Sequence, residues 1–137
     1  MYNLNHITMK RIYSLLIALF VSVAMFAQDA APKIVFEKDS HNYGNIKEAD
    51  GDASCEFRFT NEGNAPLIIT RATSSCGCTA PTYPKSPIAP GESGVIGVTY
   101  HAKGRPGGFS KNITVYTNVP DEKIKLIISG NVIPEIK

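Results

Sequence analysis

Apolar and polar residues alternate along most of the chain after residue 33, with a period of two. This period places every second side chain on the same face of an extended backbone, which is typical of a strand buried on one side. We predict strands where such alternation, or a short apolar run, lies between turn residues. The predicted strands are 34–36, 41–46, 55–60, 67–70, 95–100, 109–117 and a last one that carries Ile124, Leu126, Ile128 and Val132 on one face.

Turn-forming residues separate these strands. Residues 61–64, Asn-Glu-Gly-Asn, are typical of a turn because asparagine and glycine tolerate positive φ angles. We therefore expect residues 67–70 to return beside residues 55–60 as an antiparallel partner. Prolines recur between residues 80 and 91 and indicate a connection or an edge crossing, because proline cannot donate a hydrogen bond within a central strand.

The strand pattern leaves one way to cover the apolar faces. No segment after residue 33 shows the 3.6-residue period of an amphipathic helix over a useful length. The apolar faces of the strands must therefore cover one another, as two sheets that pack face to face. About seven short strands separated by turns predict an all-β fold, namely an immunoglobulin-like sandwich of two sheets.

The N-terminal segment has the pattern of an export signal. A basic start at residues 9–11 precedes an apolar run at residues 12–26, and Ala27 is a suitable last residue before cleavage. The run is shorter than the roughly 20 residues of a membrane span, so an uncleaved anchor is the less favoured alternative. We therefore expect a signal peptide at 1–27 and one domain at 28–137. We expect this domain in the periplasm or outside the cell, without a membrane span. The start codon of the whole chain is either Met1 or Met9.

Charge excludes one class of partner. The whole chain carries 14 Lys and Arg against 12 Asp and Glu. The predicted signal contains Lys10 and Arg11 and no acidic residue, so the formal net charge of residues 28–137 is zero. A neutral domain has no general electrostatic attraction for nucleic acid, and we expect it to bind none.

The sequence lacks the motifs of several common catalytic sites. It has neither Gly-x-Ser-x-Gly nor His-Glu-x-x-His, and no glycine-rich loop precedes a helix that could bind phosphate. We therefore expect a domain that is not an enzyme. A sandwich offers edge strands and end loops to a partner, so the leading hypothesis is a protein-interaction or scaffold domain that contacts another envelope or secreted protein.

The unusual motif is Cys76-Gly77-Cys78. Residues i and i+2 of a strand lie about 6.6 Å apart, and a disulfide needs Cα atoms roughly 4.4–6.8 Å apart with closer Cβ atoms. A bond between Cys76 and Cys78 therefore requires a bend at Gly77, which glycine permits. Three interpretations stay open: a structural pair, a soft-metal site for Cu(I) or half of a zinc site, and a redox pair. No Lys or Arg lies between Arg71 and Lys85, so no charge close in the sequence explains an activated thiolate.

Other candidate ligands are scattered. Cys55 shares a strand face with two phenylalanines and is predicted to be a small buried core residue. A zinc site at the cysteine pair would need two further ligands from Cys55, His41, His101 or a second chain, although both histidines are expected to be ordinary strand residues. Acidic residues at 48, 50 and 52 predict a solvated turn, with weak calcium binding as the alternative.

Several short motifs follow one another in the part of the chain after residue 27. They are Tyr-Gly-Asn-Ile at 43–46, Phe-x-Phe-Thr-Asn-x-Gly-Asn-x-Pro-Leu at 57–67, Ser-Cys-Gly-Cys-Thr at 75–79, Ile-x-Pro-Gly-Glu at 88–92, Phe-x-Lys at 109–111 and Thr-Asn at 117–118. In these motifs the chain resembles Domain of Unknown Function 1573, a family of exported bacterial immunoglobulin-like domains. The resemblance implies the sandwich fold and export, and it brings no assigned activity.

Overall fold

The computed structural model describes residues 9–15 and 29–136. The chain divides into two compact units, Met1–Ala30 and Ala31–Lys137. In the first unit, residues 9–15 form an exposed helix. The predicted cleavage point after Ala27, and most of the apolar run that precedes it, lie outside the described residues. A search of the described helical structure finds none long and apolar enough to cross a membrane.

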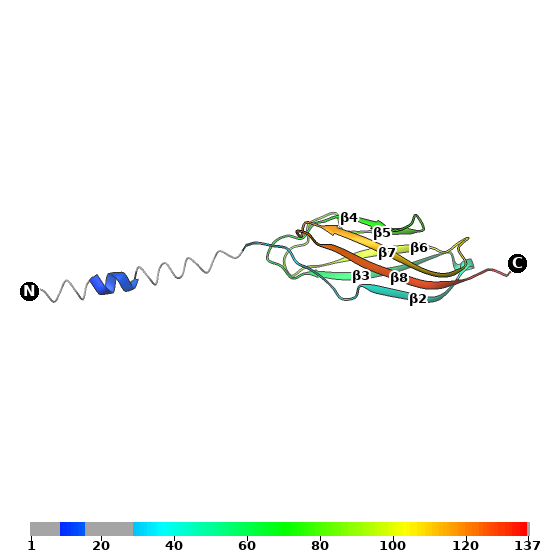
Figure 1. Ribbon diagram of the computed structural model, residues 1–137, viewed down its shortest axis with the longest axis horizontal. Helices are drawn as coiled ribbons and strands as arrows, with labels where there is room; N and C mark the ends of the chain where they lie inside the picture. Colours follow the sequence, from blue (N-terminus) through cyan, green and yellow to red (C-terminus); the bar gives the residue numbers. More distant parts are fainter. Residues whose placement is uncertain (1–8, 16–28, 137) are drawn as a thin grey trace, which may run out of the picture. The chain divides into compact units, whose positions relative to one another are not determined.

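The second unit is a sandwich of two four-stranded sheets (Figure 1). One sheet has the strand order β1-β3-β6-β5 and the other has the order β2-β8-β7-β4. A short 3-10 helix, η1, occupies Glu48–Asp50, where a polar turn was predicted. The strands are β1 Ile34–Phe36, β2 Ser40–Lys47, β3 Asp52–Asn61, β4 Ile69–Ser74, β5 Thr79–Thr82, β6 Ser93–His101, β7 Gly107–Thr117 and β8 Lys123–Ile133.

The apolar faces of the two sheets form one core, which confirms the predicted sandwich. In β3 the alternation of apolar and polar residues places Phe57 and Phe59 on the inner face, where both are completely buried. The same alternation in β7 buries Ile113 and Val115. Both sheets thus hide one face and expose the other, as expected for strands with period-two patterning. The other apolar residues of the core are Ile34, Leu67, Ile69, Cys78, Ile96, Val98, Tyr100, Ala102, Leu126, Ile128 and Val132.

The predicted hairpin between residues 55–60 and 67–70 is wrong. Strand β3 pairs with β1 and β6, whereas β4 belongs to the other sheet and pairs with β7. Leu67 makes an isolated bridge to Ile88 before the chain reaches β4. The chain therefore changes sheet between β3 and β4 instead of turning back. Alternation fixes which face of a strand is buried, but it does not fix which strand lies beside it.

A buried asparagine organises the sheet change between β3 and β4. Asn61 is fully buried at the end of β3. Its Oδ1 accepts hydrogen bonds from the backbone N–H groups of Gly63 at 3.0 Å and Lys33 at 3.3 Å. Its Nδ2 donates to the carbonyl oxygens of Ala65 at 2.8 Å and Ile88 at 2.9 Å. One side chain thus joins three separate segments of backbone.

The glycine in the same motif serves close approach, not a positive φ angle. Asn61, Gly63 and Asn64 are not among the described residues with positive φ, so the reason given for a turn here is wrong. A Cβ at Gly63 would overlap the carbonyl oxygen of Ala31. Asn64 makes two hydrogen bonds to Ala31. Its backbone N–H donates to the Ala31 carbonyl oxygen at 3.0 Å, and its Oδ1 accepts from the Ala31 N–H at 2.8 Å.

Proline placement follows the prediction more closely. Strand β5, which contains Pro81, is the outer strand of its sheet and pairs only with β6 in that sheet. An outer strand leaves one side of its backbone unpaired, so a missing N–H there costs little. This short strand brings the number of strands to eight instead of about seven.

Candidate functional site

The Cys-Gly-Cys motif lies in the connection between β4 and β5, where the chain passes from one sheet to the other. On one side, Ser75 N–H donates to the carbonyl of Asn112 in β7 at 3.0 Å. On the other side, the carbonyl of Cys78 accepts from His101 N–H in β6 at 2.8 Å. Backbone hydrogen bonds therefore fix the motif to both sheets.

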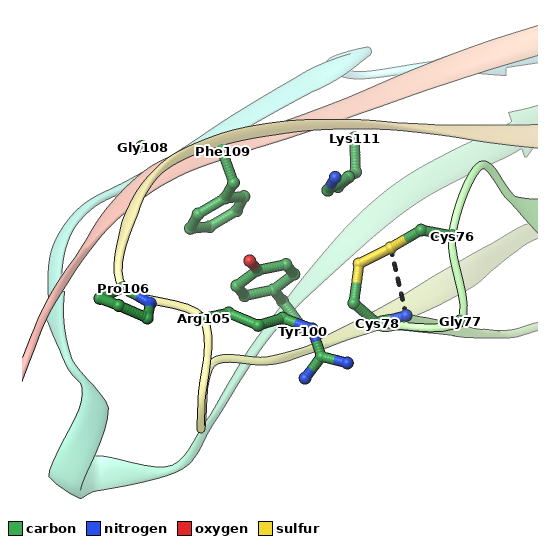
Figure 2. A pocket seen from close by; sticks show the side chains of 9 residues that line it. All are labelled: Cys76, Gly77, Cys78, Tyr100, Arg105, Pro106, Gly108, Phe109 and Lys111. Atoms are coloured by element: carbon green, nitrogen blue, oxygen red, sulfur yellow. Dashed lines mark hydrogen bonds between the residues drawn. A yellow bond between two sulfur atoms is a disulfide. The ribbon is translucent and has the colours of Figure 1, made fainter.

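Cys76 and Cys78 form a disulfide, with their Cα atoms 5.3 Å apart. This distance is shorter than that of an extended strand, so the expected bend is present. The backbone N–H of Cys78 donates to Sγ of Cys76 at 3.1 Å, as Figure 2 shows. Gly77 makes this bend without a positive φ angle, and a Cβ at Gly77 would meet open space.

The two sulfur-bearing residues differ in exposure. Cys78 is only 5% exposed and belongs to the core, whereas Cys76 is half-buried at its margin. The Thr79 hydroxyl oxygen lies 3.7 Å from Sγ of Cys78. An approaching molecule therefore meets Cys76 first.

A pocket of about 450 Å³ opens beside the disulfide. Two cationic side chains line it: Lys111 from β7 and Arg105 from the β6–β7 loop (Figure 2). The Arg105 guanidinium is fixed by hydrogen bonds from Nη1 to the carbonyls of His101 at 3.2 Å and Lys103 at 3.3 Å. The tertiary fold thus supplies the positive charge that is missing from the sequence around the cysteines. The other lining residues are Cys76, Gly77, Cys78, Tyr100, Pro106, Gly108 and Phe109.

An aromatic pair forms the wall of the pocket. The rings of Tyr100 and Phe109 are stacked, with centroids 3.8 Å apart and an interplanar angle of 10°. Tyr100 is buried and comes from one sheet, whereas Phe109 is half-buried and comes from the other. The stack therefore spans the two sheets and gives the pocket a rigid apolar surface next to its cations.

Sequence reasoning found the two cysteines but missed the other side chains of this site. Arg105 lies between the predicted strands 95–100 and 109–117, and Phe109 and Lys111 lie in the second of them, without any link to the cysteines. The Ser-Cys-Gly-Cys-Thr and Phe-x-Lys motifs occur in the same chain, but nothing in the sequence indicates that they meet. Their meeting depends on the pairing of β7 with β4, which leads into the motif.

Cys55 is a free cysteine in β3, paired in register with Val98. It packs against the core but is half-buried, so the prediction of a small buried core residue is correct in position and only partly correct in burial. Burial raises the pKa of the Cys55 thiol, and the side-chain hydrogen bond with Tyr43 only partly opposes that shift. Burial likewise raises the pKa of Tyr43. Cys55 does not bridge to Cys76 or Cys78, which are bonded to each other.

The histidines considered as ligands face other groups. His41 lies in β2, its Nδ1 is 3.3 Å from Lys38 Nζ, and its ring packs edge-on against Tyr43. Partial burial, and then the charge of Lys38, lower the pKa of His41. His101 pairs instead with Asp52, with 2.9 Å between Nδ1 and Oδ1.

Two carboxylates of the predicted acidic turn, those of Glu48 and Asp52, also bind other groups of the protein. Oδ1 of Asp52 is used by His101, while Glu48 Oε1 accepts from Gly104 N–H at 2.8 Å and Glu48 Oε2 accepts from Glu135 N–H at 3.2 Å. Glu48 thus connects η1 to two other segments. In the portion of the chain that is described, no three His, Cys, Asp or Glu residues are grouped so that they could hold a metal ion.

Comparisons with known proteins agree with this fold. A family model described as protein of unknown function (DUF1573) matches residues 34–132. No curated protein matches the chain. Among solved structures, a protein of unknown function from Porphyromonas gingivalis W83 has a TM-score of 0.63 and 16% identity over 77% of this chain and 50% of that one. The ASH/PapD-like domain 7 of human CEP192 has a TM-score of 0.63 and 9% identity, over 81% of this chain and 92% of that one.

A third similar structure comes from an enzyme. The VesB protease of Vibrio cholerae has a TM-score of 0.55 and 16% identity, over 74% of this chain and 31% of that one. The chain thus spans half or less of these two bacterial proteins. Identities at this level show the shared sandwich fold and nothing about activity.

Proposed function

The chain belongs to the DUF1573 family, and we propose that it is an exported, non-catalytic domain that binds another envelope or secreted protein through the pocket beside its disulfide. The observation that carries this proposal is the combination of Arg105 and Lys111 with a stacked aromatic pair in one open pocket. Such a combination suits a ligand that presents negative charge and apolar surface together.

The ligand that fits this pocket is an acidic peptide segment with an apolar side chain. The Arg105 guanidinium offers several N–H donors in a plane, which match a carboxylate, and the Lys111 ammonium adds a second charge. None of the described residues that line the pocket is acidic, so the two cations are not neutralised from within it. The half-buried ring of Phe109 offers apolar contact to a neighbouring side chain of the peptide.

The fold is well suited to a module that works by contact. The similarity to CEP192 covers 92% of a separate PapD-like domain, which supports a self-contained sandwich. The similarity to VesB covers only 31% of that protease, so it gives no support for proteolysis by this chain. Export from the cytoplasm is part of the proposal and is supported by the signal-like pattern at residues 1–27.

Titration with a defined peptide tests the proposal. The probe is a short peptide of glutamates around one phenylalanine, and its control replaces each glutamate with glutamine. We expect salt-sensitive binding of the acidic peptide only, weakened about tenfold when Arg105→Gln and Lys111→Gln are combined, since about 1.4 kcal/mol changes affinity tenfold. The control is the double variant Lys103→Gln/Lys125→Gln. If it binds the acidic peptide with the same affinity as Arg105→Gln/Lys111→Gln does, the assignment of the pocket as the binding site is refuted.

A further inference from the structure

We propose that the Cys76–Cys78 disulfide is a thiol-exchange site, which accepts two electrons from a dithiol on a partner protein. This inference goes beyond peptide binding, because it concerns covalent chemistry at sulfur and does not require an acidic ligand. Three features support it, namely the unequal exposure of the two cysteines, the groups around their sulfur atoms, and the independence of the fold from the bond.

Exposure sets the direction of attack. Both cysteines line the pocket, but Cys76 is half-buried, whereas Cys78 is only 5% exposed and packs in the core. An incoming thiolate must approach a sulfur atom along the axis of the disulfide bond, so access decides which sulfur is attacked. The geometry therefore makes Sγ of Cys76 the electrophile and Cys78 the leaving group.

The surrounding groups stabilise each thiolate as it forms. When Cys78 leaves, the Thr79 hydroxyl, 3.7 Å from its Sγ, is in a position to donate a hydrogen bond. When Cys76 leaves in the second step, the backbone N–H of Cys78 already points at its Sγ from 3.1 Å. Arg105 and Lys111 line the same pocket and add positive charge, which favours thiolates over thiols.

The fold does not depend on this bond to join distant segments. The disulfide connects residues only two positions apart. The sheet change in which it lies is already tied to β7 through Ser75 and to β6 through Cys78, both by backbone hydrogen bonds. A cross-link over so short a loop restricts the unfolded chain little, so opening it leaves most of the stabilising structure in place.

The partner dithiol supplies both the electrons and the protons of the exchange. Its first thiolate attacks Sγ of Cys76, the Cys76–Cys78 bond breaks, and a mixed disulfide forms while Cys78 becomes a thiolate. The second thiolate of the partner then attacks the partner's own sulfur in that mixed disulfide and releases the thiolate of Cys76. The partner loses two electrons and two protons and becomes a disulfide, and Cys76 and Cys78 take up both electrons and both protons.

The first experiment measures reduction of the native protein. The full chain is incubated with millimolar 2-mercaptoethanol, a small neutral thiol, and free thiols are alkylated and mapped by mass spectrometry. We expect Cys76 and Cys78 to become reduced while circular dichroism shows the native fold. Reduction that occurs only under denaturing conditions would overturn the proposal, because the bond would then be an inert part of the structure.

The second experiment tests the order of attack. The reduced protein is alkylated briefly, and we expect label at Cys76 about tenfold faster than at Cys78, because access and thiolate fraction govern reactivity. Cys55 serves as an internal reference, since burial raises its thiol pKa, and it should also lag behind Cys76. Equal labelling of the pair, or faster labelling of Cys78, would overturn the assigned roles. The Cys78→Ser and Cys76→Ser variants repeat the comparison with one cysteine at a time.

Thiol exchange and the recognition of an acidic ligand can be refuted independently of each other. Reaction with 2-mercaptoethanol reports exchange at sulfur alone, whereas glutathione also carries carboxylates that Arg105 and Lys111 can attract. If exchange is correct and acidic recognition is wrong, both thiols react and the Arg105→Gln/Lys111→Gln variant slows them by the same factor. If both are correct, that variant slows glutathione several-fold more than 2-mercaptoethanol, and the Lys103→Gln/Lys125→Gln control changes neither rate.

Discussion

Replacing Asn61 with alanine should destabilise the sandwich more than almost any other single polar substitution. The amide of Asn61 is completely buried and makes four hydrogen bonds, all to backbone groups. Alanine would leave the N–H groups of Lys33 and Gly63 and the carbonyl of Ala65 without these partners, and the Ile88 carbonyl would keep only the N–H of Leu67. Backbone groups that lose their partners away from water cost free energy comparable to a lost hydrogen bond each.

The magnitude follows from the number of bonds. At about 1 kcal/mol net for each hydrogen bond, the loss for Asn61→Ala is about 3–4 kcal/mol, with water entry at the exposed end of the network lowering the upper value. A domain of roughly 110 residues unfolds with an entropy near 0.23 kcal/mol per kelvin, so the melting temperature should fall by about 15 °C.

Urea and thermal denaturation followed by circular dichroism measure this loss. The matched control is Asn45→Ala, because Asn45 is exposed and its Oδ1 accepts one hydrogen bond, from Asn131 at 3.1 Å. That control should change the free energy of unfolding by less than about 0.5 kcal/mol. If Asn61→Ala costs less than about 1 kcal/mol, the side chain does not organise the sheet change as argued, and the surrounding backbone must find other partners.

Three further substitutions test local packing by the same denaturation assay. Gly63→Ala should cost about 1–3 kcal/mol, because its Cβ would overlap the Ala31 carbonyl oxygen, and an unchanged midpoint would contradict this. Gly77→Ala should be neutral or stabilising by up to about 1 kcal/mol, because its Cβ meets open space and its φ is not positive, so a large loss would mean that glycine is required at the bend. Cys55→Ala should cost about 1 kcal/mol or less, equally under oxidising and reducing conditions, since Cys55 is a free cysteine, whereas a loss confined to oxidising conditions would indicate a bridge.

Much of the fold could be predicted because local patterning determines burial. Phe57 and Phe59, two residues apart in β3, are both fully buried, as period-two alternation requires. The same pattern in β7 and β8, together with the lack of helical periodicity, was sufficient to predict two facing sheets. These features depend only on side chains close together in the sequence.

Strand order could not be predicted in the same way. Residues 61–64 have the composition of a hairpin turn, but Asn61 and Asn64 hydrogen-bond to the segment that leads into β1, and Gly63 packs closely against it. The decisive interactions join residues nearly thirty positions apart, such as Lys33 with Asn61. A glycine required for close approach and a glycine required for positive φ look identical in a sequence, so the two causes were confused.

The candidate site was predicted in part for a related reason. Spacing alone showed that Cys76 and Cys78 could meet only at a bend, and the structure has that bend. The cations are a different case, since Arg105 and Lys111 reach the pocket only through the fold of β6 and β7. Charge near a thiol in space therefore could not be deduced from charge near it in sequence.

Two motifs of the chain, Asn-x-Gly-Asn-x-Pro-Leu at 61–67 and Cys-Gly-Cys at 76–78, lie at the two sheet changes on either side of β4. At the first, Asn61 is fully buried, its hydrogen bonds are internal, and the motif has a structural explanation. At the second, backbone hydrogen bonds of Ser75 and Cys78 already hold the crossing, yet a disulfide is added that lines an open, cationic pocket, with Cys76 the more exposed of its two residues. A purely structural device would gain nothing from that exposure. The contrast between a closed junction and an open one is therefore the strongest reason to seek the function of this domain at Cys76.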